Sequence, residues 1–283
     1  MKKSRRHALG QHFLSSRAVL AKIVGVISPR KDDVILEIGA GKGALTFALA
    51  EKAGRVIAIE KDERLIPGLR EAMPANVEVV HGDALTFDFR GYLTSAGLST
   101  VRVAGNLPYS ISSPFLWRIL EERDLFTDGL FLLQKEVAQR VTAGPGSKSY
   151  APLGILLQNE FDARIAFTVA PGSFSPPPKV QSALLSLRRR AIPLHAVAHS
   201  PEFGAFLRAA FAERRKILWK NLARHMTADA LDAAFERCGL SRTSRAEELS
   251  PDRFAALFTA FGQGAESAKR LAEARRSGSK PAF

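Results

Sequence analysis

The strongest constraint on the fold is a short apolar run that leads into a cluster of glycines and then into a helical pattern. Residues 34–38 read VILEI, and residues 39–44 read GAGKGA. Glycine lets the backbone turn tightly and approach a ligand closely, and a helix that starts there presents free backbone N–H groups. This order predicts the first unit of an α/β sheet, with a ligand-binding loop at its carboxyl edge.

The same order recurs along the first two thirds of the chain. The β-branched runs that we expect to form strands are 34–38, 55–60, 77–80, 101–104, 129–133, 165–169 and 183–188. Helical patterns occupy residues 44–53, 62–73 and 112–125. Strands that alternate with helices at this spacing predict a parallel, doubly wound sheet with helices on both faces. We expect the last two strands to form an antiparallel pair at the edge.

Strand patterns stop after about residue 192, and helical patterns take over. They cover residues 202–211, 214–225, 228–238 and 252–261. Ser244 and Glu247 have the spacing of a capping box, and Ser250-Pro251 places proline at a first helical position. We therefore expect an α/β domain over residues 1–192, a smaller helical domain over 193–262, and a flexible basic tail over 263–283, which is rich in small and charged residues.

The charge of the chain narrows the class of partner. With 41 Lys and Arg against 28 Asp and Glu, the net charge of +13 suits a polyanion such as nucleic acid, or an acidic membrane surface. The basic N-terminus lacks the apolar core of a signal peptide, and no run approaches the roughly 18 apolar residues of a membrane span. The single cysteine, Cys238, excludes an internal disulfide and a thiolate metal cluster. We expect a monomeric cytoplasmic protein with no membrane segment and no metal site.

The glycine loop alone leaves the ligand open. Gly39, Gly41 and Ala44 fit the dinucleotide fingerprint, with Glu60 about twenty residues further on as the acid that binds a ribose. Lys42 is not followed by Ser or Thr, which excludes a phosphate P-loop. The loop is therefore consistent with NAD, with S-adenosylmethionine or with a structural turn.

Two carboxylates stand at the ends of neighbouring strands. Glu60 ends the second strand, where its oxygens can accept both ribose hydroxyls. Asp83 follows the third strand and can accept a hydrogen bond from an adenine amino group. Either one alone can be an ordinary loop acid. Together with the glycine loop they favour a ligand site, because open α/β sheets bind ligands at the carboxyl ends of their strands.

The fourth strand runs directly into Asn106-Leu107-Pro108-Tyr109. A nucleobase amino group is a poor nucleophile because its lone pair is delocalised into the ring, and two acceptors aimed at its N–H bonds draw that pair out. The Asn106 side-chain oxygen and the Leu107 carbonyl can be these acceptors. Pro108 can hold their geometry, and Tyr109 can stack on the base. The alternative is an asparagine turn followed by a proline and a packed tyrosine.

Taken in order, these motifs resemble the series found in S-adenosylmethionine-dependent N6-adenine methyltransferases. More narrowly, the chain resembles the small-subunit ribosomal RNA adenine dimethyltransferases over about residues 5–260. The further stretches that carry this resemblance are 9–14 (LGQHFL), 133–137 (LQKEV), 144–150 (GPGSKSY) and 174–180 (FSPPPKV). It implies a Rossmann-like class I methyltransferase domain with a helical C-terminal domain. It also implies dimethylation at N6 of two adjacent adenosines in a hairpin loop near the 3′ end of 16S rRNA, within the small ribosomal subunit.

The resemblance implies two overlapping sets of site residues. Contacts to S-adenosylmethionine, and to its product S-adenosylhomocysteine, would come from His12, Leu14, Gly39, Gly41, Glu60, Asp83 and Asn106. The catalytic set would be Asn106, Leu107, Pro108, Tyr109 and Phe174. His12 departs from the family, which commonly has asparagine there. Phe174 would sandwich the target adenine against Tyr109, and the alternative for Phe174 is a place in the hydrophobic core.

The implied reaction is a direct in-line attack of adenine N6 on the sulfonium methyl, without a covalent enzyme intermediate. Alignment of the two reacting atoms at about 3–3.5 Å supplies much of the acceleration. No strong general base is needed, because the methylated amine is acidic enough to lose its proton to water or to a neighbouring carbonyl. The target adenosine must be unpaired or flipped to enter the pocket.

A basic segment in the second domain is the leading candidate for contact with RNA phosphates, together with the basic N-terminus. Its residues are Arg214, Arg215, Lys216, Lys220 and Arg224. The alternative is a solvated charged face, and the net charge favours phosphate contact.

Two other functions stay open at this point. A large-subunit rRNA adenine dimethylase of the macrolide-resistance type shares the catalytic motifs, but residues 144–150 and 211–222 look more like the small-subunit enzymes. The second is a binding protein that acts as a ribosome assembly checkpoint, with methylation secondary or lost. The intact 106–109 motif argues that activity is retained.

Overall fold

The computed structural model describes residues 12–262, which divide into two compact units. One unit takes the described residues up to Thr142 together with Glu160–Ala191, and the other takes Ala143–Asn159 together with the described residues from Ile192. Residues 143–159, which the sequence prediction assigned to the first domain, therefore belong to the second unit. The basic N-terminus and the tail predicted over 263–283 lie outside the described residues.

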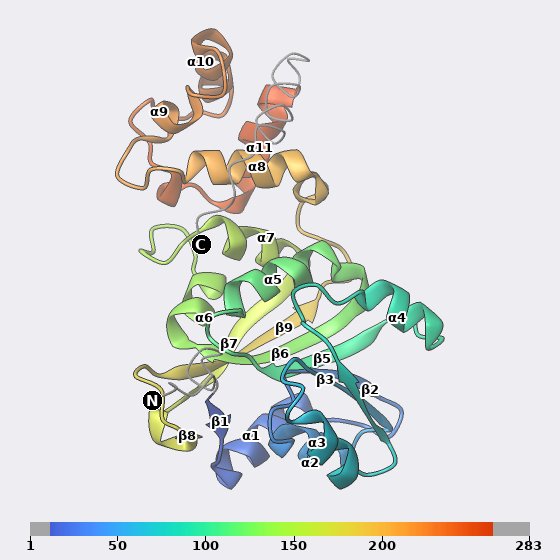
Figure 1. The fold of residues 1–283 in the computed structure, drawn as a ribbon. Helices are drawn as coiled ribbons and strands as arrows, with labels where there is room; N and C mark the ends of the chain where they lie inside the picture. The colour runs from blue at the N-terminus through green and yellow to red at the C-terminus, as the bar shows by residue number, and fades with distance from the viewer. Residues whose placement is uncertain (1–11, 263–283) are drawn as a thin grey trace. The chain divides into compact units, whose positions relative to one another are not determined.

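A seven-stranded sheet forms the centre of the first unit, in the order β4-β3-β2-β5-β6-β9-β7 (Figure 1). The strands are β2 (Val34–Ile38), β3 (Arg55–Glu60), β4 (Val77–His81), β5 (Val101–Asn106), β6 (Phe126–Gln134), β7 (Phe161–Val169) and β9 (Ser182–Arg189). The pairs from β4 to β6 are parallel, whereas β9 runs antiparallel to both β6 and β7. All seven predicted strands are therefore confirmed, including the antiparallel pair at one edge.

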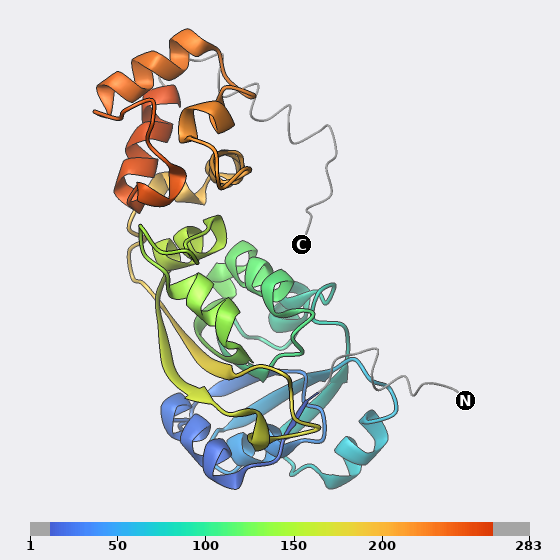
Figure 2. The same ribbon diagram turned by 90° about the vertical axis from the view of Figure 1, so that its left-hand side faces the viewer.

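Helices cover both faces of this sheet, as the alternating pattern predicts. They are α1 (Arg17–Ile27), α2 (Ala44–Ala50), α3 (Ile66–Ala72), α4 (Phe89–Ser95), α5 (Ser112–Glu121) and α6 (Lys135–Thr142). Helices α1, α2 and α3 lie on one face and α4, α5 and α6 on the other (Figures 1 and 2). Helix α3 begins later than the predicted residue 62, because Pro67 is tolerated only in a first turn.

A second, two-stranded sheet brings the start of the described chain against a distant loop. Strand β1 (Phe13–Leu14) pairs antiparallel with β8 (Phe174–Ser175), and Leu14 lies opposite Phe174. Each strand has two residues, too few for an alternating pattern to reveal it in the sequence.

The second unit is helical. Its elements are α7 (Pro152–Glu160), whose last residue belongs to the first unit, α8 (Pro201–Ala210), α9 (Leu218–Leu222), α10 (Ala228–Arg237) and α11 (Pro251–Gly262). The helix predicted over 214–225 is wrong, because only the short α9 forms there. The buried Asn221 side chain donates hydrogen bonds to the carbonyls of Ala210 and Glu213, at 2.8 and 3.1 Å, and so ends α8 with a turn.

The two helix-start signals of this unit have different outcomes. The capping box predicted for Ser244 and Glu247 is wrong, since the backbone N–H of Arg245 donates to Glu248 at 2.9 Å and starts a single 3₁₀ turn. The start at Ser250-Pro251 is confirmed. The Ser250 hydroxyl caps α11, because it accepts a hydrogen bond of 3.3 Å from the N–H of Arg253, the third residue of the helix.

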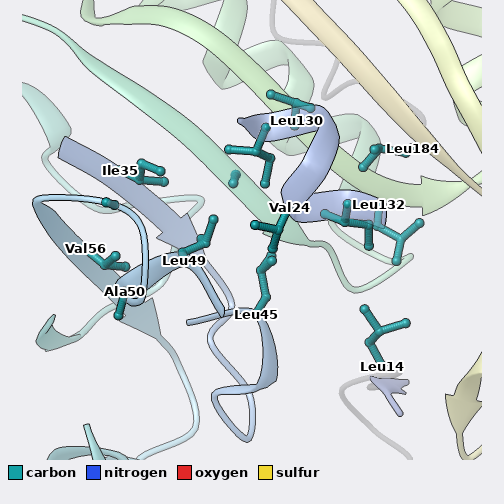
Figure 3. Packing of buried hydrophobic residues seen from close by; sticks show 14 of the residues in the cluster. Leu14, Val24, Ile35, Leu45, Leu49, Ala50, Val56, Leu130, Leu132 and Leu184 are labelled. Atoms are coloured by element: carbon teal, nitrogen blue, oxygen red, sulfur yellow. The ribbon is translucent and has the colours of Figure 1, made fainter. Parts of the chain in front are cut away.

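A hydrophobic cluster of buried side chains lies between α1, α2 and the sheet (Figure 3). Val24 and Leu49 of the helices pack with Ile35, Leu130 and Leu184 of the strands. Each such side chain contributes about 1.5–3 kcal/mol when it is fully buried. Leu14 and Phe174 belong to the same cluster, so the β1–β8 pair is attached to the core.

Gly105 sets how closely β5 approaches β2 just before Asn106. A Cβ atom at this position would lie 2.6 Å from the Ile38 carbonyl oxygen and 3.3 Å from the Leu107 side chain. A backbone oxygen in a paired strand cannot move aside easily. Glycine is therefore required by the close packing of the two strands, and not by an unusual φ angle.

We expect Gly105→Ala to lower the free energy of unfolding by about 1–3 kcal/mol, because the added methyl pushes β5 away from β2. Urea denaturation followed by circular dichroism measures this change. The matched control is Gly25→Ala in α1, where a Cβ atom meets nothing within 4 Å. Its stability should stay constant or rise by about 0.5–1 kcal/mol, because alanine favours a helix. Equal stability of the wild type and Gly105→Ala would contradict this account.

Candidate functional site

A cavity of about 490 Å³ opens at the carboxyl ends of the parallel strands, entirely within the first unit. It is lined by residues 12–15, 37–42, 59–61, 82–84 and 106–111, with Ala44, Leu45 and Ser175. Every residue that the sequence analysis places at the cofactor or catalytic site lines this cavity, with the exception of Phe174. Segments more than ninety residues apart in the chain thus converge on one pocket, as expected for an open α/β sheet.

The glycine loop takes a conformation that needs glycine at three positions. Gly39, Gly41 and Gly43 have φ angles of +75°, +59° and +83°. These angles lie in the left-handed region, which other residues adopt only with strain. At Gly41 a Cβ atom would also approach the Phe13 ring to 3.1 Å. The loop is therefore shaped by backbone requirements and presents its main chain to the cavity.

Glu60 fixes this loop to the end of β3. One carboxylate oxygen accepts from the Gly41 N–H at 2.7 Å, and the other accepts from the N–H groups of Lys61 and Asp62 at 2.9 and 2.8 Å. The residue is only 4% exposed. Because the two carboxylate oxygens together can accept about four hydrogen bonds and three are made within the protein, Oε2 can still accept one from a ribose hydroxyl of a ligand.

Asp83 is held in place by a cation and a backbone donor. Its carboxylate accepts from the Lys61 ammonium at 2.7 Å and from the Leu85 N–H at 3.0 Å. Partial burial raises the pKa of Asp83, but these two donors outweigh it, and the pKa lies below its ordinary value. Asp83 is therefore ionised at neutral pH and acts only as a hydrogen-bond acceptor.

The amide of Asn106 has a defined orientation. Its Nδ2 donates a hydrogen bond of 2.9 Å to the backbone carbonyl of His12. A carbonyl can only accept, so this bond assigns the nitrogen to the His12 side, and Oδ1 is left without a hydrogen-bond partner among residues 12–262. The adjacent peptide is fixed as well, because the Leu107 N–H donates to the Leu132 carbonyl at 2.9 Å.

Tyr109 and His12 form the wall beside Asn106. The Tyr109 hydroxyl lies 2.7 Å from the Ser182 hydroxyl, and its ring lies 5.4 Å from the His12 ring, centroid to centroid. The Nδ1 atom of His12 lies 2.8 Å from the Pro176 carbonyl and must carry the hydrogen of this bond. The His12 side chain thus binds within the protein, and a direct contact with a cofactor stays a prediction.

The structure does not place Phe174 on the pocket wall opposite Tyr109, and its stacking on the target adenine stays a prediction. Phe174 is 4% exposed, belongs to the hydrophobic cluster and does not line the cavity. The β1–β8 pairing explains this, because neighbouring residues of a strand point to opposite sides. The Phe174 side chain therefore enters the core, and Ser175 reaches the pocket in its place.

Glu37 is a pocket residue whose role the sequence analysis did not identify. It is 1% exposed, and its Oε2 atom has no hydrogen-bond partner among the described residues. The pKa of Glu37 is raised to about 7, mainly by burial and to a smaller extent by the nearby Glu60 charge. The Thr46 hydroxyl offsets part of this rise, although it forms no hydrogen bond of normal geometry. The available signal was an acid inside the apolar run 34–38.

The five residues predicted to contact RNA phosphates all lie in the second unit, but they differ in their surroundings. Arg214 donates to Glu247 at 3.1 Å and to the Ser147 carbonyl at 3.2 Å. Lys216 and Arg224 both form ion pairs with Glu213. Arg215 and Lys220 are exposed and form no ion pair with a described residue. The sequence pattern does not reveal these intramolecular pairs.

Within residues 12–262, none of the described His, Cys, Asp and Glu residues form a group of three or more that is arranged to hold a metal ion. In the same part of the chain, no helix combines the length and the apolar character that a membrane crossing requires.

Comparison with known proteins adds independent evidence. The family model described as ribosomal RNA adenine dimethylase matches residues 2–263. The ribosomal RNA small subunit methyltransferase A of Geobacter metallireducens is 46% identical over 261 residues, which cover 90% of this chain and 95% of the relative. The protein of the same name from Myxococcus xanthus is 40% identical and covers 91% of both chains.

Two solved structures have the same architecture. A dimethyladenosine transferase from Plasmodium falciparum aligns with a TM-score of 0.72 and 26% identity, over 90% of this chain and 98% of that one. The 23S rRNA methyltransferase ErmE aligns with a TM-score of 0.68 and 28% identity, over 89% and 100% of the two chains.

We expect Glu37 to make the stability of the protein depend on pH. Between its ordinary pKa and about 7, the folded protein holds a proton that the unfolded chain releases, so the free energy of unfolding falls as the pH rises through this range. The loss should be about 2–3 kcal/mol between about pH 4.5 and pH 8. It should be absent from Glu37→Gln, which mimics the protonated acid.

Urea denaturation at a series of pH values measures this difference. The control is Glu71→Gln, an exposed acid of α3, which should retain the wild-type pH dependence. Parallel pH profiles for the wild type and Glu37→Gln would show that Glu37 titrates normally in the folded protein.

Proposed function

This chain belongs to the ribosomal RNA adenine dimethylase family, and we propose that it dimethylates N6 of two adjacent adenosines in a hairpin loop near the 3′ end of 16S rRNA. It is an S-adenosylmethionine-dependent methyltransferase with a Rossmann-like fold and a helical C-terminal part. The observation that carries the proposal is the orientation of Asn106, whose Oδ1 is left without a partner among the described residues by the bond from Nδ2 to the His12 carbonyl.

The pocket residues suit S-adenosylmethionine. The cavity volume of about 490 Å³ lies within the usual range for small-molecule sites. Glu60 can accept a hydrogen bond from one ribose hydroxyl, and ionised Asp83 can accept one from the adenine amino group. The unpartnered Oε2 of Glu37 is a buried polar atom on the same wall and is available to a polar group of a ligand. The glycine loop lets the protein backbone come close to a bound ligand, and Leu14 lines the same cavity.

The remaining pocket residues suit a flipped adenine. When bound, S-adenosylmethionine supplies an electrophilic methyl on its sulfonium. Asn106 Oδ1 and the Leu107 carbonyl accept the two N–H groups of N6 and direct its lone pair away from the ring. Pro108 holds these acceptors, and Tyr109, which is held by Ser182, provides a face on which the base stacks. The proton leaves the methylated amine to water or to a neighbouring carbonyl, without a covalent enzyme intermediate.

The partner in this proposal is the small ribosomal subunit. Support comes from two relatives, 46% and 40% identical, that are both named for small-subunit RNA, whereas the 23S enzyme is 28% identical. The net charge of +13 suits contact with RNA, and the helical second unit carries the basic residues 214–224. We further propose that the enzyme acts as a monomer in the cytoplasm. An intact pocket favours an enzyme over a checkpoint protein that has lost methylation.

Single-turnover transfer of labelled methyl groups to under-methylated small subunits tests the reaction. The wild type should place two methyls on each of two adjacent adenosines. Asn106→Ala should reduce the rate more than a hundredfold, because loss of one such acceptor costs about 3 kcal/mol of transition-state stabilisation. Affinity for the subunit should change little. Wild-type rates from Asn106→Ala with saturating subunits would contradict the catalytic role of Asn106. Methylation of large-subunit RNA in place of small subunits would contradict the proposed substrate.

Isothermal titration calorimetry tests the cofactor assignments. Glu60→Ala and Asp83→Ala should each weaken binding of S-adenosylhomocysteine by about ten- to a hundredfold, because each removes hydrogen bonds to a charged group. Glu71→Ala, an exposed acid outside the pocket, is the matched control and should bind as the wild type does. NAD should not bind. Wild-type affinity in both pocket variants would show that these carboxylates do not contact the ligand.

A further inference from the structure

The Glu213 carboxylate lies between two cations of the second unit. Its Oε2 is 2.8 Å from the Lys216 ammonium, and its Oε1 forms an ion pair with the Arg224 guanidinium. Lys216 precedes α9 and Arg224 follows it, so the two cations reach the same carboxylate from the two ends of a short helix. One acid thus forms ion pairs with two of the five basic residues that are proposed to contact RNA.

The backbone around Glu213 is fixed by a buried amide. Asn221, which is 1% exposed, donates to the Glu213 carbonyl at 3.1 Å, and the Lys216 N–H donates to the same oxygen at 2.9 Å. The fold therefore fixes the backbone position from which the Glu213 side chain extends. The three charged side chains remain open to solvent, with 38%, 45% and 52% of Glu213, Lys216 and Arg224 exposed.

Glu213 remains an anion at every pH of physiological interest. The hydrogen bond from Lys216, together with Arg224, holds its pKa below the ordinary value of a glutamate. A carboxylate and a phosphate offer similar acceptor oxygens to Lys and Arg, and charge-assisted bonds to either anion have similar lengths. The place that Glu213 occupies is therefore chemically suited to a phosphate group.

We propose that Glu213 occupies an RNA phosphate site, and that a backbone phosphate of the bound RNA displaces its carboxylate from Lys216 and Arg224. The identity of the polyanion as RNA rests on the proposed function. Arg215 and Lys220 make the first contact, because they form no ion pair with any described residue. Lys216 and Arg224 bind only when a phosphate replaces Glu213. The carboxylate thereby weakens binding to any anion that cannot displace it, and so increases selectivity.

The central experiment compares Glu213→Gln with Glu236→Gln. Glu236 is an exposed acid on α10 of the same unit, and no ion pair joins it to a described residue. Both variants remove one negative charge, so they change the net charge equally, but only Glu213→Gln removes ion pairs. Filter binding should use a short RNA hairpin and small ribosomal subunits at several salt concentrations. Glu213→Gln should bind both about three- to tenfold tighter than the wild type, since two surface ion pairs no longer compete. Glu236→Gln should differ from the wild type by about twofold or less.

Two further variants separate displacement from a general charge effect. Glu213→Asp keeps the charge, but it is one methylene too short to reach both cations, so it should also tighten binding. In a background of Lys216→Met and Arg224→Met, Glu213→Gln should give no gain. A gain of full size in that background, or no gain from Glu213→Asp, would overturn the proposal. Weaker binding by Glu213→Gln at an unchanged melting temperature would also overturn it.

The outcomes are distinct from those of the proposed function. Absence of methylation on small subunits, with the predicted shifts in RNA affinity, would reject the reaction and retain the phosphate site. Normal methylation with equal RNA affinity for the wild type and Glu213→Gln would reject only the phosphate site.

Discussion

The parallel pairing of β2 with β3 and β5 is the constraint on which the site depends. Strands that run in one direction deliver their carboxyl ends to one edge, and there Glu37, Glu60 and Asn106 line the same pocket. Close pairing has its own requirement, since Gly105 must lack a side chain for β5 to pass the Ile38 carbonyl. The chemistry of the pocket is thus a consequence of strand direction and spacing, and the loops add the glycine turn and Asp83.

Much of the fold and of the site could be predicted from sequence because both depend on short-range patterns. The β-branched runs identify all seven strands of the main sheet, and motifs at their ends identify eight of the pocket residues, whereas His12 and Leu14 came only from the resemblance to a family. The sequence left Phe174 between the pocket and the core, because the direction of its side chain depends on pairing with Leu14, which is 160 residues away. The helix over 214–225 failed because Asn221 binds the carbonyls of the preceding turn, a contact without any periodic signal.

The surroundings of each charged residue determine its pKa and whether it is available to bind a ligand. Burial, with a second acid nearby, raises the pKa of Glu37, whereas the Lys61 ammonium helps to lower the pKa of Asp83, which stays ionised. On the second unit, basic residues that look equivalent in the sequence separate into paired and unpaired ones. A net charge describes the attraction between the protein and a polyanion at long range. Specific acid–base pairs decide which cations are available at contact.

The bond between Asn106 and residue 12 uses the main-chain carbonyl, not the histidine ring. Any amino acid carries that carbonyl, so substitutions at this position can preserve the amide orientation provided the path of the chain is kept. A histidine at position 12 is therefore compatible with the orientation of the Asn106 amide. What this position contributes to the site is a peptide oxygen at a fixed point in space, whichever side chain it carries.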